Sequence, residues 1–193
     1  MTPTLSSLAE HFAFWQARAQ AWWTRANRFG LMLRVTVWAS GFAALMLAAP
    51  PEARWTFGLG LAVLFPLVPM AKPQLSWATG VEVVVLCMWF IATVGDEYPS
   101  ILWAGFLGTA MYVHHAATTA CAQWRADADV PVAVRRSWLW RTGVIAGASV
   151  GIATVVSVLA QNPLPFAPPV LVIVALLLAG GVIFVLAMRA ARR

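Results

Sequence analysis

Charged side chains are scarce in this sequence of 193 residues. Only 10% of the chain is Asp, Glu, Lys or Arg, whereas 61% is hydrophobic and the mean hydropathy is +0.77. A soluble domain carries about 25% charged residues, which cover its water-facing surface. Because the apolar residues also lie in long blocks, the composition excludes an ordinary soluble domain and predicts a protein that lies mostly in lipid.

Cysteine, histidine and acidic residues are also few, at two, three and seven. Cys87 lies in the middle of one apolar segment and Cys121 near the end of the next, so their depths differ and no disulfide is expected. Neither cysteine belongs to a metal-type cluster, and no loop has the glycine pattern that binds phosphates. A haem between two histidines would need a facing histidine on another span, and His11 lies outside the spans. We therefore predict no metal and no cofactor.

The net charge of +6 does not indicate a protein that binds nucleic acid. Nucleic-acid-binding faces cluster Lys and Arg on a soluble surface, often with interleaved aromatic residues. Here the basic residues lie beside apolar segments, where they orient a chain in the membrane. The lipid bilayer is therefore the expected partner, and nucleic acid is not.

The apolar segments predict an all-α, polytopic membrane protein. A hydrocarbon core of about 30 Å requires about 20 helical residues, so a chain of this length can hold about six spans with short connections. Pro66 and Pro69 lie in the last turns of the second span and predict a kink whose free backbone groups are satisfied by neighbouring helices. The predicted spans are residues 31–49, 55–71, 77–95, 99–122, 142–160 and 170–188, within a transmembrane domain of 31–188 that precedes a basic tail at 189–193.

Residues 1–30 form a separate juxtamembrane segment in this prediction, with an amphipathic helix over residues 7–29. Ser7 and Glu10 match a capping box, and apolar residues, among them Trp15 and Trp22, recur on one helical face. Arginines lie toward the other side, so the helix can rest among anionic lipid headgroups at the cytoplasmic face. The alternative is that it packs on the cytoplasmic side of its own bundle or of a partner subunit.

The distribution of Lys and Arg predicts the orientation. The N-terminal segment, Lys72, the predicted loop at 123–141 and the tail carry every basic residue except Arg54 and Arg34, and Arg34 lies near the inner end of the first span. Six spans place these four segments on one side, which the positive-inside rule makes cytoplasmic, together with both termini. A single lysine against twelve arginines, with much Ala and Val, resembles proteins of high-GC bacteria. The expected location is therefore a bacterial inner membrane.

Small residues repeat at four-residue spacing in two spans. Gly143, Gly147 and Gly151 fall on one face of the fifth span, where the missing side chains let another helix approach closely. Ala39 and Ala43 form a weaker version in the first span. Two interpretations are open: packing within the bundle, or docking of a second membrane protein.

Three ionisable residues within the spans are the candidates for a ligand or proton site. Glu82 lies in the third span, and His114 and His115 are neighbours in the fourth. Adjacent residues point about 100° apart on a helix, so the two histidines do not easily share one ligand. In the structural interpretation Glu82 pairs with Lys72 or a loop arginine, and each histidine bonds to a neighbouring helix. In the functional interpretation the three residues line a polar path.

Two further polar features of the sequence also have alternative interpretations. Asp96 and Glu97 form an acidic turn on the predicted outer face, which is either solvated or in contact with a cation or an outer partner. Residues 147–151 match the letters of the G-x-S-x-G nucleophile elbow but lie in a continuous apolar helix, whereas an elbow joins a strand to a helix. An intramembrane hydrolase that uses Ser149 and His115 is therefore the remotest alternative, and we predict no enzymatic activity.

The pairs Ala39/Ala43 and Ala44/Ala48 resemble the small-residue spacing in the first span of the substrate-binding subunits of energy-coupling-factor vitamin transporters. Those subunits are also small six-span proteins with cytoplasmic termini, and they use this spacing to dock their membrane partner. The resemblance is one of architecture, and it implies a transporter subunit. No vitamin-binding loop is identified in this chain.

The chain is also similar, in its size and its lack of motifs, to small accessory subunits of bacterial membrane complexes. The sequence therefore favours a non-enzymatic accessory subunit of a bacterial inner-membrane complex that packs against other membrane proteins through its small-residue faces. The alternative is a small-molecule transporter, or its substrate-binding subunit, that uses Glu82, His114 and His115.

Overall fold

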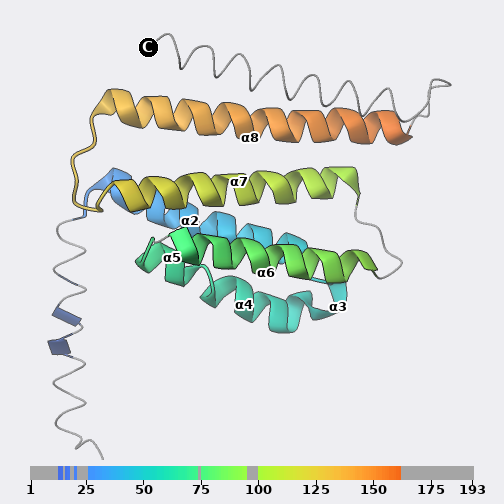
Figure 1. Ribbon diagram of the computed structural model, residues 1–193, viewed down its shortest axis with the longest axis horizontal. Coiled ribbons are helices and arrows are strands. Elements are labelled where there is room, and N and C mark those ends of the chain that lie inside the picture. Colours follow the sequence, from blue (N-terminus) through green and yellow to red (C-terminus); the bar gives the residue numbers. More distant parts are fainter. Residues whose placement is uncertain are drawn as a thin grey trace, which may run out of the picture.

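The computed structural model describes residues 26–73, 75–94 and 100–161, together with the isolated positions 13, 14, 16, 17 and 20. Within these residues the regular structure is entirely helical, and no strand is present. The helices are α2 (Arg28–Ala48), α3 (Pro51–Ala53), the π-helical turn η1 (Arg54–Gly58), α4 (Leu59–Leu64), α5 (Leu67–Ala71), α6 (Leu75–Val94), α7 (Ile101–Gln123) and α8 (Val132–Gln161) (Figure 1).

Several of these helices are suited to a membrane, which confirms the predicted class. Four helical segments are long and apolar enough to cross a bilayer: Arg28–Ala48, Arg54–Ala71, Ser76–Val94 and Val132–Val158. They coincide with four of the predicted spans. α7 coincides with the predicted span at 99–122, but its two histidines and its threonines make it more polar than those four segments.

The remaining predictions about the chain ends lie outside the described residues. These are the sixth span at 170–188, the tail at 189–193 and most of the N-terminal helix. The acidic turn with Asp96 and Glu97 also falls outside them.

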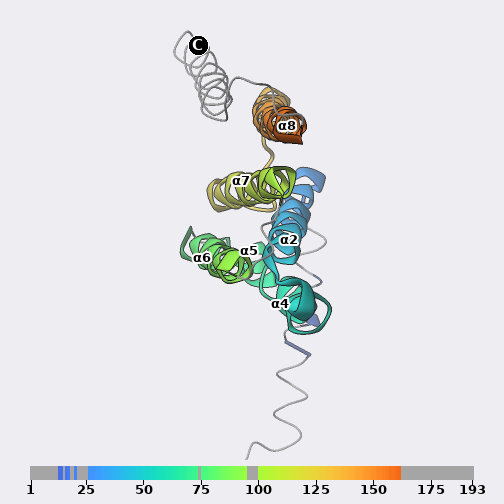
Figure 2. The same cartoon turned by 90° about the vertical axis from the view of Figure 1, so that its right-hand side faces the viewer.

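The described helices form layers, in which α7 lies between α8 on one side and α2 and α6 on the other (Figure 2).

α8 begins ten residues before the predicted start of the fifth span, so the prediction of a loop was wrong for residues 132–141, whereas residues 124–131 do form a loop. The carbonyl of Pro131 accepts bonds from the backbone amides of Val134 and Arg135, at 3.0 and 3.1 Å, and these bonds open the first turn. Proline suits this place because its fixed φ matches a helix start. The prediction placed the boundary where the apolar residues begin, whereas the helix already starts among the charged residues.

The predicted proline kink is confirmed. The second segment breaks between α4 and α5, and Pro66, which has no amide hydrogen, stands at the break. Two side chains of α2 satisfy carbonyls on this segment. The indole of Trp38 donates to the carbonyl of Val63 at 3.0 Å, and the guanidinium of Arg34 donates to that of Met70.

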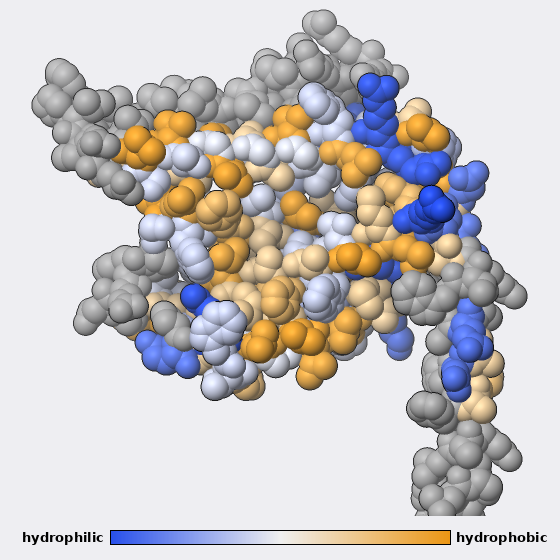
Figure 3. All heavy atoms as spheres, turned by 180° about the vertical axis from the view of Figure 1, so that it is seen from behind, coloured by the Kyte–Doolittle hydropathy of each residue, from blue (hydrophilic) through white to orange (hydrophobic). Residues whose placement is uncertain are grey.

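The start of α2 is bonded to the loop at 124–131. The Asn27 side chain caps the helix by accepting from the amide of Phe29 at 2.7 Å, and it donates to the carbonyl of Ala128 at 2.7 Å. Gly30 faces the loop backbone, since a Cβ there would lie 2.5 Å from the Ala126 carbonyl oxygen. Hydrophilic residues gather at this end of the molecule, beside an apolar lateral surface (Figure 3).

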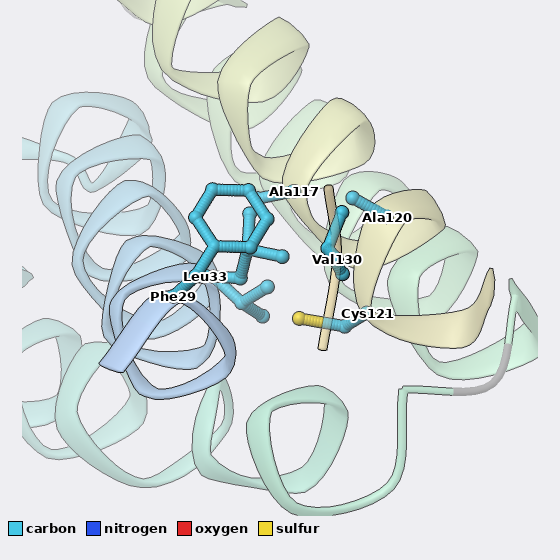
Figure 4. Packing of buried hydrophobic residues seen from close by; sticks show 7 residues of the cluster. Phe29, Leu33, Ala117, Ala120, Cys121 and Val130 are labelled. Carbon is cyan, nitrogen blue, oxygen red and sulfur yellow. The ribbon is translucent and has the colours of Figure 1, made fainter. Parts of the chain in front are cut away.

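Two hydrophobic clusters hold α2 against its neighbours. The first lies at the loop end and places Phe29 5.9 Å from Trp124 and 6.2 Å from Trp138, measured between ring centroids. Its buried members are Phe29, Leu33, Val37, Ala117, Ala120, Cys121 and Val130 (Figure 4). The second joins α2, α4, α6 and α7 through Ala44, Leu45, Ala48, Ala62, Val81, Val85 and Leu107.

Cys87 and Cys121 are both free, as predicted.

Gly105 tests the packing of α7 against α8. A Cβ at Gly105 would lie 2.2 Å from the Cβ of Ala153, whereas a Cβ at Gly108 would have no described atom within 4 Å. We expect Gly105→Ala to force the helices apart and to lower the free energy of unfolding by about 1–3 kcal/mol. Gly108→Ala, as the matched control, should keep or slightly raise it, because alanine is the better helix former. Thermal unfolding in one detergent compares them, and equal stabilities would contradict the crossing at Gly105.

Candidate functional site

Glu82 on α6 and His115 on α7 are hydrogen-bonded across the two helices. The Nδ1 of His115 lies 2.9 Å from the Oε1 of Glu82, and the side chains are 53% and 22% exposed. If the carboxylate is ionised it only accepts hydrogen bonds, and Nδ1 is then the donor. The prediction that Glu82 pairs with Lys72 or with a loop arginine was therefore wrong. The rotation of α6, which residue spacing does not encode, turns the carboxylate toward α7.

His114 points in a different direction from its neighbour. It is buried, and its Nδ1 donates to the carbonyl of Val37 on α2 at 2.9 Å. Gly41 makes room for the ring, because a Cβ at this position would lie 3.0 Å from the Nδ1 and Cε1 of His114. The Nε2 of His114 is shielded from solvent and has no hydrogen-bond partner among the described residues. The structure thus brings Glu82 and His115 together and places His114 in the contact between α2 and α7.

A cleft of about 670 Å³ lies between α7 and α8, and His115 is on its wall. The sequence prediction missed this feature, although a signal existed: His115, Thr119 and Gln123 repeat at four-residue spacing on α7. Its lining combines hydroxyl, amide and guanidinium groups with aromatic and aliphatic walls. The lining residues are Tyr112, His115, Ala116, Thr119, Ala120, Gln123, Trp124, Ala133, Val134, Ser137, Trp138, Arg141, Thr142 and Ile145.

A second, more apolar groove of about 660 Å³ lies between α2 and α7. Ala39 and Ala43 are among its lining residues, with Val35, Phe106 and Val113 beside them. The other alanine pair of α2, Ala44 and Ala48, is buried in the second hydrophobic cluster. The two pairs therefore differ: one lines an open groove, and the other packs inside the bundle.

The glycine face of α8, made of Gly143, Gly147 and Gly151, is exposed. A Cβ at each of the three would have no described atom within 4 Å. Residues two apart on a helix point about 200° apart, so this face lies opposite the cleft-lining Arg141 and Ile145. The glycines that contact described neighbours closely are instead on α2, η1 and α7.

Ser149 and His115 are not hydrogen-bonded to one another. The hydroxyl of Ser149 donates to the carbonyl of Ile145 one turn earlier in its own helix, at 2.9 Å. The Nδ1 of His115 is bonded to Glu82. A serine nucleophile needs a base within hydrogen-bond reach, and this arrangement does not provide one. Over the described ranges, no group of three or more His, Cys, Asp or Glu side chains is placed to hold a metal ion.

Comparisons with known proteins give no relative: no family model, no curated protein sequence and no solved structure matches this chain.

The two adjacent histidines should respond differently to substitution. His114→Ala would leave a cavity against Gly41 and remove a buried hydrogen bond, so we expect it to lower the free energy of unfolding by about 2 kcal/mol or more. His115→Ala removes a half-exposed ion pair, which is worth about 1 kcal/mol or less. Thermal unfolding in detergent measures both. A larger loss for His115→Ala would show that the two roles are reversed.

Proposed function

We propose that this chain is a non-enzymatic accessory subunit of a bacterial inner-membrane complex, and that it docks another membrane protein on the glycine face of α8. The observation that carries the proposal is the exposure of Gly143, Gly147 and Gly151 on one helical face. In lipid, helices associate through small residues that let backbones approach closely. This face offers three such positions in succession.

A contrast with the glycines that pack inside the fold supports this proposal. Gly60, Gly80 and Gly108 also have open space, but only on α8 do three open glycines repeat at four-residue spacing within the described residues. Gly30, Gly41 and Gly105 each meet a described neighbour at 3.0 Å or less from a Cβ position, so the fold itself uses their missing side chains. A glycine within a helix costs roughly 0.5–1 kcal/mol relative to alanine. Three glycines facing outward on α8 therefore weaken the helix without a described contact in return, and a docked helix would supply that contact.

The groove between α2 and α7 is the second surface suited to a partner helix. The small side chains of Ala39 and Ala43 line the α2 side of the groove, and Phe106 lines the α7 side. Its lining is almost entirely apolar, as expected for a contact made within the bilayer. In this proposal the partner is another membrane protein, and the glycine face is the main contact.

The orientation in this proposal follows from the charges. Asn27, Lys72 and the loop at 124–131 lie at one end of the described helices, because α2 bonds both to that loop and, through Arg34, to the end of α5. This end also carries most of the described arginines. By the positive-inside rule it faces the cytoplasm, where anionic headgroups are available to the N-terminal helix.

The experiment is co-purification from the native membrane. The tagged protein is extracted in a mild detergent, and the proteins retained with it are quantified by mass spectrometry. We expect a membrane partner in stoichiometric amount, and we expect Gly147→Leu to reduce its recovery several-fold. Gly60→Leu is the matched control. Gly60 is also an exposed helical glycine with no described atom within 4 Å of a Cβ position, but it lies on α4 and not on the glycine face of α8.

Two results would contradict the docking proposal. One is Gly147→Leu leaving every retained protein unchanged. The other is Gly147→Leu lowering the melting temperature of the chain purified alone, which would show that the glycine face packs within the chain, for example against the predicted span at 170–188.

The second candidate function is a small-molecule transporter or a substrate-binding transporter subunit. The observation that favours it is the pair formed by Glu82 and His115, whose histidine stands on the wall of the cleft between α7 and α8. Glu82→Gln and His115→Ala should then each abolish uptake of the substrate while expression is kept. Uptake that survives alanine at Glu82, His114 and His115 together would exclude this path.

A further inference from the structure

We propose that the cleft between α7 and α8 is a binding site for one anionic phospholipid, whose phosphate is held by Arg141. This site lies on the side of α8 opposite the glycine face, so the inference does not depend on the proposed docking. It rests on the charge of the cleft, its unpaired polar groups and its length.

The charge of the cleft favours an anion. Arg141 lines it and forms no ion pair within the described part of the chain, and no Asp or Glu is among the lining residues. Three described carboxylates have other partners: Glu82 bonds to His115, Asp127 lies 3.2 Å from Arg125, and Asp129 lies 4.0 Å from Arg135. A guanidinium between two helices at the basic end of a membrane protein is suited to a lipid phosphate.

The cleft also holds polar groups that a headgroup would satisfy. The hydroxyl of Thr119 is shielded from solvent and has no hydrogen-bond partner in the regions that the structure describes. Ser137 and Gln123 line the same cleft, and each can donate to a phosphate or glycerol oxygen. A buried hydroxyl without a partner costs about 1–3 kcal/mol, which a bound headgroup would offset.

The shape of the cleft fits a lipid better than a small soluble anion. Its α8 wall runs from Ala133 to Ile145, a rise of roughly 18 Å at about 1.5 Å per residue. Most of this wall is apolar, and it continues past Arg141 toward the centre of the bundle. Trp138 stands beside the arginine, and tryptophan is enriched where headgroups meet hydrocarbon. With the phosphate at Arg141, about 12 Å of the cleft lies toward Ala133 and can take the headgroup, whereas about 6 Å lies toward Ile145 and can take the first part of an acyl chain.

Native mass spectrometry of the purified full-length protein tests this site. Phosphatidylglycerol and phosphatidylcholine with the same acyl chains are titrated separately, and the fraction of protein with one bound lipid is measured. We expect tighter binding of phosphatidylglycerol, and an increase of about tenfold in its dissociation constant for Arg141→Gln. Arg136→Gln is the matched control, because Arg136 is exposed on the same helix but does not line the cleft.

A second variant tests the cleft without changing its charge. Ala133 is exposed at the mouth of the cleft, so Ala133→Trp should obstruct it and weaken phosphatidylglycerol binding without unfolding the protein. Equal affinities for the two lipids would overturn the proposal, as would an affinity unchanged by Arg141→Gln and Ala133→Trp. Displacement of the lipid by millimolar inorganic phosphate would also overturn it, since the ligand would then be a soluble anion.

Discussion

The close approach of α2 and α7 at Gly41 is the constraint on which the rest of the structure depends. Because Gly41 has no side chain, the ring of His114 fits against α2 and donates to the Val37 carbonyl at 2.9 Å. A polar ring in an apolar contact is tolerated only when it is hydrogen-bonded, so this bond fixes how the two helices are rotated against each other. The two hydrophobic clusters lie on either side of it along α2, and a turn of either helix would disturb both.

Long donor side chains complete this arrangement at the helix ends. The indole of Trp103 donates to the carbonyl of Leu47 at 2.8 Å, and Arg54 donates to that of Ala49 at 3.2 Å. The guanidinium of Arg54 also lies 5.2 Å from the ring centroid of Trp103. Hydrocarbon offers no water to such carbonyls, so side chains must satisfy them. This explains why Arg54 departs from the other basic residues: it caps the end of α2.

The helical class and most helix positions could be predicted from the sequence, because the length and hydropathy of a span are local properties. α6, at Leu75–Val94, lies within two residues of the predicted span, and the break at Pro66 follows from its missing amide hydrogen. The start of α8 could not be placed by hydropathy, since its first turns carry Arg135 and Arg136. The length of an apolar segment reports where lipid begins, which differs from where a helix begins.

The candidate site was only partly predictable, because it depends on how helices are rotated. Glu82 lies on α6, and His114 and His115 lie on α7, but the spacing of these residues in the sequence does not say which of them face one another. Glu82 and His115 meet only because α6 and α7 pack at one particular rotation. The cleft residue Arg141 was assigned to a loop, so its position on the α7-facing side of a helix was missed.

The two faces of α8 explain why its sequence looks contradictory. Read along the helix, polar residues, glycines and aliphatic residues alternate without one clear apolar stripe. The directions of the side chains around the helix axis separate these residues. Arg141, Ile145 and Ala153 point toward α7, whereas the three exposed glycines face away from it. A helix that contacted only lipid on its outer side would gain stability from alanine or leucine there. The three glycines on that side and the cleft on the other therefore fit the proposal of a helix placed between two different contacts.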